Sequence, residues 1–203
     1  MRPFYFFSVT KTVTKQEKKM NKVKSDSNNS ITRSNNVVID LLYLDLSVCT
    51  RCQGTESSLE DSLESLIELL QSSDREVKFN KIHIETKEQA IQHHFVSSPT
   101  IRVNGKDVQM KVKESHCSTC SSLTDGASVD CRVWVYKDKE YSVPPKTMII
   151  DAVLNIIYNT KEMSEQEDHS QYRLSKNLIE YFEKKDQLCA NVTPSKSSSC
   201  GSC

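Results

Sequence analysis

The residues from Val37 to Leu46 form an almost unbroken apolar run, Val-Val-Ile-Asp-Leu-Leu-Tyr-Leu-Asp-Leu. A run of this length and composition is typical of a strand that is buried on both faces of a sheet. It ends directly before Cys49-Thr50-Arg51-Cys52. The sequence therefore predicts a core strand that leads straight into a pair of thiols.

An amphipathic helix is predicted after this pair. Leucine and isoleucine recur there at helical spacing, with acidic residues between them, which indicates a helix from about 54 to 72. A second strand over 77–84 and a short helix over 86–95 follow. The chain up to this point predicts alternating strands and helices.

Two hairpins are predicted in the next part of the chain. Asn104-Gly105 lies between alternating apolar segments, 101–103 and 108–112, and both turn residues tolerate positive φ. After a polar insertion over 113–130, a second hairpin is expected around Asp138-Lys139. A closing helix begins after Pro144-Pro145, and a further amphipathic helix is expected over about 170–186.

Length and charge favour one domain with tails. The chain has 203 residues and a formal net charge of zero. We expect a disordered arm over 1–35, one domain over 36–160, and a helical extension with a flexible tail over 161–203. The charge balance gives no argument for nucleic acid, and no apolar run approaches the roughly 20 residues that cross a bilayer. We therefore expect a monomer that binds neither nucleic acid nor membrane.

Six of the eight cysteines form three Cys-x-x-Cys pairs, at 49/52, 117/120 and 200/203. A disulfide within such a pair closes a very short loop and would stabilise the fold little, so these pairs are better suited to redox chemistry or metal binding. This arrangement indicates a reducing compartment, and we expect the cytoplasm.

The pair of Cys49 and Cys52 is the first candidate site. Unpaired N–H groups and the dipole at a helix start stabilise a thiolate, and Arg51 adds positive charge. We expect Cys49 to be an exposed nucleophile and Cys52, one turn on, to resolve a mixed disulfide. The alternatives are a pair of buried cysteines or half of a zinc site.

The remaining thiols form two further groups. Cys117, Cys120 and Cys131, with His116 beside them, are the donors of a tetrahedral zinc site or a site for a softer ion. A second redox pair and plain loop cysteines are the alternatives. Cys200 and Cys203, on a Ser-rich tail, are secondary thiols that can carry electrons or a soft metal to a buried pair, or have no role. Cys189 receives no assignment.

Three stretches together resemble a known family: LLYLDLSVCTRCQGTESSLEDSLESL, FVSSPTIRVNG and DCRVWVYKDKEYSVPPKTMIIDAVL. They look like the thioredoxin and glutaredoxin superfamily and, more narrowly, a microbial thioredoxin-like family known as domain of unknown function 2703. The resemblance covers about residues 37–158. It implies an α/β, thioredoxin-like three-layer sandwich with a mixed central sheet, and a cis peptide bond at Pro99.

The resemblance also implies where a substrate binds. We expect Arg51, Ser98, Pro99 and Thr100 to line that site. Thr50-Arg51 stands where thioredoxin has Gly-Pro and glutaredoxin Pro-Tyr, so the resemblance does not extend to the redox potential.

The leading functional hypothesis is a thiol–disulfide oxidoreductase that uses Cys49 and Cys52 and requires no cofactor. Its partners are protein or small-molecule disulfides, with a reductase as a further candidate. The alternative is a non-enzymatic binder of zinc, copper(I), mercury(II) or arsenite, with zinc or another soft metal at Cys117, Cys120 and Cys131. A protein-interaction module that kept the fold and lost the chemistry is the third hypothesis.

Overall fold

The apolar run forms the central strand, β1 (Asn36–Tyr43), of a four-stranded sheet. The computed structural model of the chain describes residues 36–158 and 172–191. The predicted arm over 1–35 and the tail thiols Cys200 and Cys203 lie outside the described residues.

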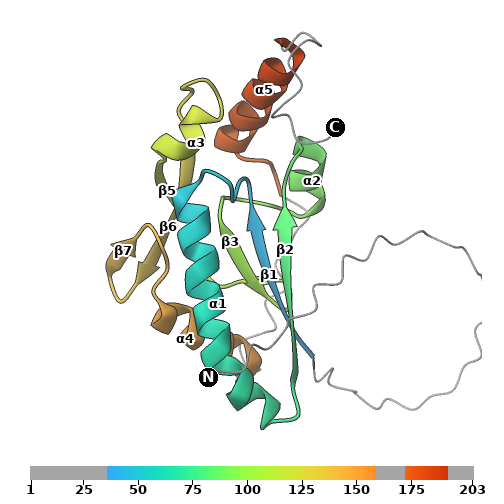
Figure 1. Ribbon diagram of the computed structural model, residues 1–203, viewed down its shortest axis with the longest axis vertical. Helices are drawn as coiled ribbons and strands as arrows, with labels where there is room; N and C mark the ends of the chain where they lie inside the picture. Colours follow the sequence, from blue (N-terminus) through green and yellow to red (C-terminus); the bar gives the residue numbers. More distant parts are fainter. Residues whose placement is uncertain (1–35, 159–171, 192–203) are drawn as a thin grey trace, which may run out of the picture. The chain divides into compact units, whose positions relative to one another are not determined.

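The sheet is mixed, as predicted. β1 pairs in parallel with β2 (Glu76–His83) on one side and antiparallel with β3 (Thr100–Val103) on the other. β4 (Lys106–Asp107) completes the order β2-β1-β3-β4. The molecule is therefore a mixed α/β protein, with helices packed on its sheet (Figure 1).

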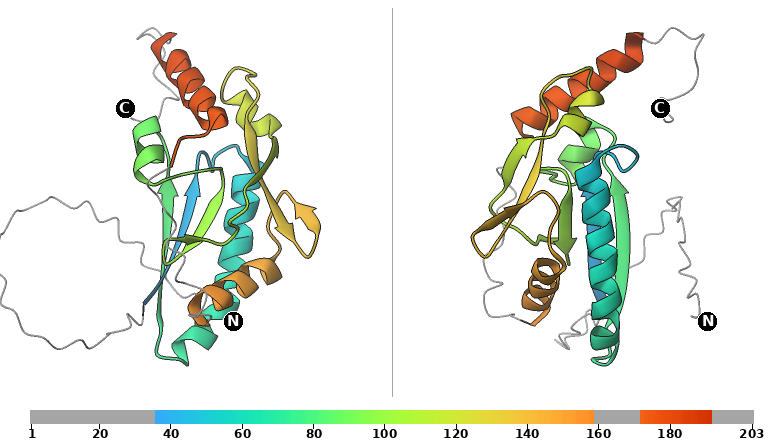
Figure 2. Two further views of the ribbon diagram at one scale, coloured as in Figure 1. Left: turned by 180° about the vertical axis from the view of Figure 1, so that it is seen from behind. Right: turned by 60° about the vertical axis from the view of Figure 1, so that its left-hand side comes forward.

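α1 (Thr50–Gln71) lies along the sheet and packs against α4 (Lys146–Tyr158). Its buried leucines, at positions 59, 63, 66 and 70, meet the alternate residues Val37, Ile39 and Leu41 of β1 in the main core. Figure 2 shows this layer of helices from two further sides. The helix starts earlier than the predicted residue 54, because Cys49 caps it and begins its first turn.

The first predicted hairpin is confirmed, and its turn residues have the expected positive φ, 51° at Asn104 and 82° at Gly105. The predicted second strand, 108–112, is wrong, because the strand that pairs with β3 is Lys106–Asp107 and residues 108–112 form no strand. After Asp107, the Gln109 side chain donates to the carbonyl of Val133 and accepts from the N–H of Val135. The chain thus leaves the first sheet to join the second. α2 (Lys87–Gln92) is also shorter than predicted, because His94 has a φ of 45° that a helix cannot continue.

The second sheet has the order β5-β6-β7. β6 (Asp130–Tyr136) and β7 (Lys139–Tyr141) form the second predicted hairpin, with its turn at Lys137 and Asp138. β5 (Lys113–His116) and α3 (Ser118–Ser122) lie in the segment that was predicted as a polar insertion. Of the second group of cysteines, Cys131 lies in β6, and Cys117 and Cys120 lie at the start of α3, which follows β5.

A buried arginine joins the two sheets. The Arg132 guanidinium, on β6, is fully buried and pairs with Asp107 of β4 at 2.7 Å. It also donates to Thr100 Oγ1, and its backbone N–H donates to the carbonyl of Ser98 at 2.7 Å. β6 is thereby held against the segment that leads into β3.

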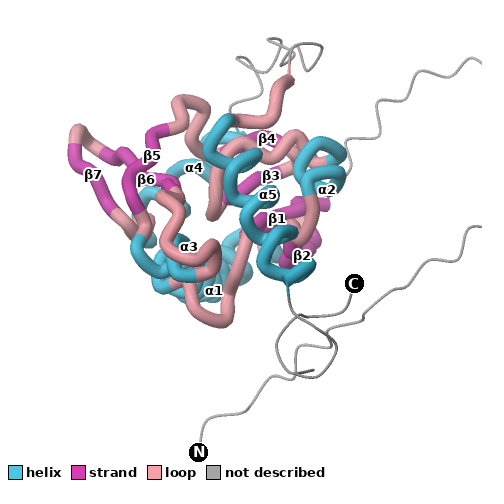
Figure 3. The backbone as a smooth tube through the Cα atoms, turned by 90° about the horizontal axis from the view of Figure 1, so that it is seen from above, coloured by secondary structure: helices cyan, strands magenta, loops and turns pink. Residues whose placement is uncertain are grey.

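α5 (Lys176–Asn191) begins later than the predicted 170. The Asn177 amide forms hydrogen bonds with both backbone groups of Asp130, which fixes the start of α5 on β6. Before α5, the Tyr172 hydroxyl donates to the carbonyl of Phe95 at 2.6 Å. Figure 3 looks down on the end where α2, α3 and α5 lie. Within residues 36–158 and 172–191, no helix is long and apolar enough to span a bilayer.

Candidate metal centre

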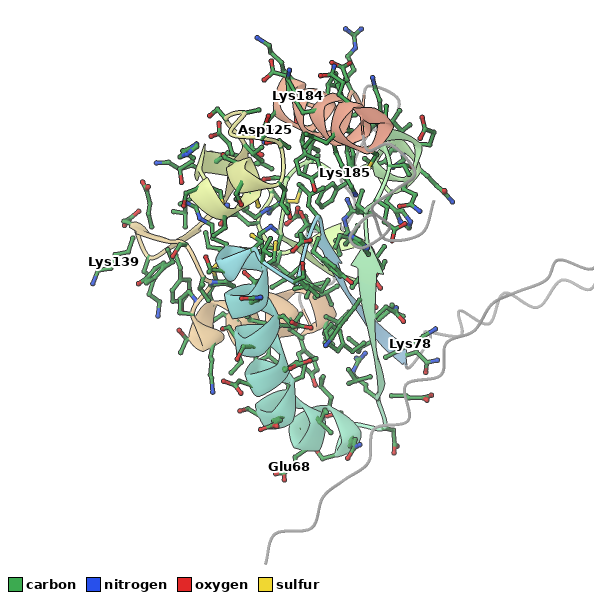
Figure 4. The ribbon with its side chains drawn as sticks, turned by 45° about the horizontal axis from the view of Figure 1, so that its top comes forward. Glu68, Lys78, Asp125, Lys139, Lys184 and Lys185 are labelled. Carbon is green, nitrogen blue, oxygen red and sulfur yellow. The ribbon has the colours of Figure 1, made fainter. Side chains whose placement is uncertain are left out.

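Five buried cysteines gather in a second core at the end of β1 where α1 begins. They pack with apolar side chains from β1, α2, α5 and the intervening loops. Figure 4 shows yellow sulfur atoms close to the first turn of α1. The cysteines are Cys49, Cys52, Cys117, Cys120 and Cys131. Two parts of the chain that are distant in sequence, 49–52 and 117–131, therefore bring their thiols to one place.

Four of these thiols form a compact group. The sulfurs of Cys49, Cys117, Cys120 and Cys131 all lie within 4.8 Å of one another. Cys120 Sγ is 3.3 Å from Cys49 Sγ and 3.2 Å from Cys131 Sγ. These contacts are too long for a disulfide, whose S–S bond is about 2.05 Å. A tetrahedral zinc ion with bonds of about 2.3 Å would hold its sulfurs roughly 3.8 Å apart, so the group has the dimensions of a four-thiolate site.

Two Cys-x-x-Cys pairs take the same position at two different helices. Cys49 is the N-cap of α1, and its sulfur accepts the N–H of Cys52 at 3.5 Å. Cys117 is the N-cap of α3, and Cys120 lies in the first turn of that helix. The loop before Cys49 is held by Asp45, which accepts the N–H groups of Ser47 and Val48. The first thiol of each pair thus projects from a helix start.

Cys131 reaches the group from β6, where it lies opposite Ser115 of β5. Arg51 joins this hairpin to α1, because its guanidinium donates to the carbonyls of Ser115, His116 and Cys131 at 2.8 to 3.3 Å. Arg51 was predicted to bind substrate. The structure places its guanidinium on three backbone carbonyls beside the cysteines.

Cys52 is the fifth buried thiol and lies outside the group of four. Its sulfur is 3.4 Å from Ser98 Oγ, which also accepts the N–H of Leu44. The peptide bond between Ser98 and Pro99 is cis, as the family resemblance implied. Ser98, Pro99 and Thr100 are all buried, so the segment expected to bind substrate lies beneath the surface in this structure.

The environment separates the pKa values of the thiols. Hydrogen bonds from the other thiols, that of Cys117 first, lower the pKa of Cys49, and hydrogen bonding with Cys120 lowers that of Cys117 to about 5. The pKa values of Cys120 and Cys131 are raised, in both cases chiefly by hydrogen bonding with Cys117. The pKa of Cys52 is raised by its interaction with Cys49 and by burial. Two of the four grouped thiols therefore favour the thiolate, and two favour the protonated form.

The prediction that Cys49 is exposed to solvent is wrong. Its side chain is 0% exposed, although the residues on either side of it, Val48 and Thr50, are at the surface. The buried cluster that contains Cys49 includes the start of α3 and the apolar face of α5, with Leu178, Tyr181 and Phe182. Helices from later parts of the chain thus close over a thiol that a bare helix start would expose.

The structure brings together the three cysteines that were predicted to bind metal and adds Cys49 as a fourth thiol that could bind the same ion. His116, the imidazole weighed with them, is exposed and lies outside the group, with its Nδ1 3.2 Å from Ser128 Oγ. Cys189 is half-buried on α5 and also lies outside. The sequence signal for joining the two groups was their shared Cys-x-x-Cys spacing, but that signal says nothing about distance in space.

Comparisons with known proteins place the chain by its sequence. Residues 37–153 match the sequence model of the family described as domain of unknown function (DUF2703). No curated protein and no solved structure shows a significant match. The match includes the five buried cysteines and ends before α5. Because it spans more than half of the chain, the protein belongs to the DUF2703 family.

Proposed function

We propose that this protein binds a single soft metal ion through the thiolates of Cys49, Cys117, Cys120 and Cys131. The observation that carries the proposal is the mutual approach of four buried sulfurs to within 4.8 Å. Thiolate donors select soft or borderline ions such as zinc and copper(I), and four of them at this spacing suit a tetrahedral ion.

The chemistry of such a site follows from its closure. Four protein ligands leave no open position for a substrate, so the ion would be bound or stored rather than used as a Lewis acid. When bound, zinc would hold α1, α3 and β6 together. Arg51 orients the cysteine-bearing segments through their carbonyls. A reducing compartment such as the cytoplasm keeps these thiols available.

A zinc competition titration of reduced protein tests the proposal. Wild type is expected to bind one equivalent. A structural four-thiolate site has an apparent binding free energy of about 10–16 kcal/mol, so loss of one ligand should cost roughly a quarter of it, which is about a hundredfold to a thousandfold in affinity. Cys131→Ser and Cys117→Ser should show this loss. Cys189→Ser, a thiol outside the group, is the matched control and should bind as wild type does.

Two results would contradict the metal site. One is a reduced wild-type protein that binds no zinc, copper(I) or cadmium above the level of the Cys131→Ser variant. The other is a ligand variant that binds zinc as tightly as the Cys189→Ser control.

A thiol–disulfide oxidoreductase of thioredoxin-like fold is the second candidate. The order β-α-β-α-β-β from β1 to β4, with Cys-x-x-Cys at the start of α1, supports it. Protein or small-molecule disulfides would be its substrates. Disulfide reductase activity that is lost in Cys49→Ser and replaced by a trapped mixed disulfide in Cys52→Ser would favour this function. The burial of both thiols makes it the weaker candidate.

A further inference from the structure

Cys52 is a buried thiol that the four-thiolate site does not use. It lies one helical turn after Cys49, and its N–H donates to the Cys49 sulfur at 3.5 Å. Its own sulfur contacts Ser98 Oγ rather than the other three cysteines. Cys49 therefore has two sets of sulfur neighbours, the three other proposed ligands and the thiol of its own Cys-x-x-Cys pair.

We propose that oxidation of Cys49 and Cys52 to a disulfide releases the metal ion. This inference rests on the proposed function, because it concerns regulation of the same site. The disulfide would withdraw one of four ligands and leave the ion with Cys117, Cys120 and Cys131. The protein would then hold its ion under reducing conditions and, once oxidised, bind it weakly enough for a competing ligand to take it.

The oxidant is a small-molecule disulfide such as glutathione disulfide. The Cys49 thiolate leaves the metal and attacks one sulfur of the disulfide, forming a mixed disulfide and expelling one thiolate. Cys52 loses its proton and attacks the Cys49 sulfur, which expels the second thiolate. The two protein sulfurs are oxidised, and the external disulfide is reduced to one thiolate and one thiol, the latter taking the Cys52 proton.

Of the possible disulfides, the one between Cys49 and Cys52 breaks the fewest metal–sulfur bonds. A disulfide between Cys49 and Cys120, or between Cys120 and Cys131, would remove two ligands at once. A disulfide between Cys49 and Cys52 removes only one, since Cys52 is not a ligand. The shorter sulfur contacts, 3.2 and 3.3 Å, are thus the ones that bound metal protects.

The start of α1 also lies close to solvent. Ser47, Val48 and Thr50 are exposed, and Val48 has 43% of its surface accessible. In contrast, Cys120 and Cys131 are buried, and their neighbours Ser121 and Arg132 are buried as well. A small opening at the first turn of α1 would therefore expose Cys49 before Cys120 and Cys131.

The test uses full-length zinc-loaded protein in a glutathione redox series, with released zinc measured by a chromophoric chelator and disulfides mapped by mass spectrometry. Wild type should release one equivalent of zinc together with a disulfide between Cys49 and Cys52. Cys52→Ser cannot close this disulfide, because no neighbouring thiol is left to attack the mixed disulfide at Cys49 and expel glutathione. It should therefore need at least about tenfold more glutathione disulfide for half of its zinc to be released. Cys189→Ser is the matched control and should behave as wild type.

The inference is overturned if Cys52→Ser releases zinc at the wild-type midpoint, or if the disulfide that accompanies release in wild type joins other cysteines. Mapping the wild-type protein decides the matter even where the variant fails to fold. Failure of the proposed function looks different, since the protein would then hold no zinc before the oxidant is added.

Discussion

At the scale of single residues, the protonation of the thiols governs how tightly the centre can bind. Metal ions bind thiolates, so every protonated ligand must lose its proton on binding. Cys49 and Cys117 have lowered pKa values, that of Cys117 being about 5, whereas those of Cys120 and Cys131 are raised. In metal-free protein, these shifts favour the thiolate at the first two cysteines and the protonated thiol at the last two.

This distribution predicts how zinc affinity depends on pH. About two protons leave on binding, so affinity should rise with pH, with the logarithm of the apparent constant increasing by about two per pH unit between about 6 and 8. Competition titrations at several pH values measure the slope. A slope near four would mean that all four thiols start protonated, and a slope near zero that none does, and either contradicts the assigned pKa directions.

A second prediction concerns the Arg132–Asp107 ion pair. Asp107→Ala leaves a guanidinium that is 0% exposed without its carboxylate, so the free energy of unfolding should fall by about 3–5 kcal/mol. Urea unfolding of metal-free protein measures this change. Asp61→Ala removes an exposed pair with Lys146 and should cost less than about 1 kcal/mol. Equal losses in the two variants would show that the buried pair does not stabilise the join between the sheets.

At the scale of elements, three separate attachments position the cysteines. Arg51 ties α1 to β5 and β6 through backbone carbonyls. Asn177 ties α5 to β6, and Tyr172 ties the approach to α5 to the end of α2. The apolar face of α5 then covers the thiols. The burial of the centre thus depends on an element that lies beyond the family match.

Asn177→Ala should loosen this cover. The variant leaves the N–H and carbonyl of Asp130 without their side-chain partner, at a cost of about 1–3 kcal/mol. If that cost falls on the docking of α5, the buried thiols of metal-free protein should react about tenfold faster with a disulfide reagent. Asp186→Ala, an exposed position on the same helix, is the control. Equal thiol reactivity in the two variants would contradict a covering role for α5.

At the scale of the whole molecule, the sequence predicted the secondary-structure elements that are determined by their own local residue pattern. The apolar run of β1, the leucine spacing of α1 and the Asn104-Gly105 turn each carry their own signal, and all three were found. β5 was missed because Lys-Glu-Ser-His has no apolar alternation, and its strand forms only by pairing with β6.

The candidate centre could be predicted only in part for the same reason. Cys117, Cys120 and Cys131 are close in sequence, so their association was predictable from spacing. The approach of Cys49 depends on a hairpin more than 60 residues away, held to α1 by Arg51. The burial of Cys49 depends on α5, still further along the chain. The residues around Cys49 contain no signal for its approach to the other cysteines or for its burial beneath α5.

The most direct test of the central claim is X-ray absorption spectroscopy at the zinc edge of the loaded full-length protein. Four sulfur neighbours at about 2.3 Å, with no nitrogen or oxygen in the first coordination sphere, are predicted. A nitrogen or oxygen ligand, or fewer than four sulfurs, would contradict a centre built from Cys49, Cys117, Cys120 and Cys131.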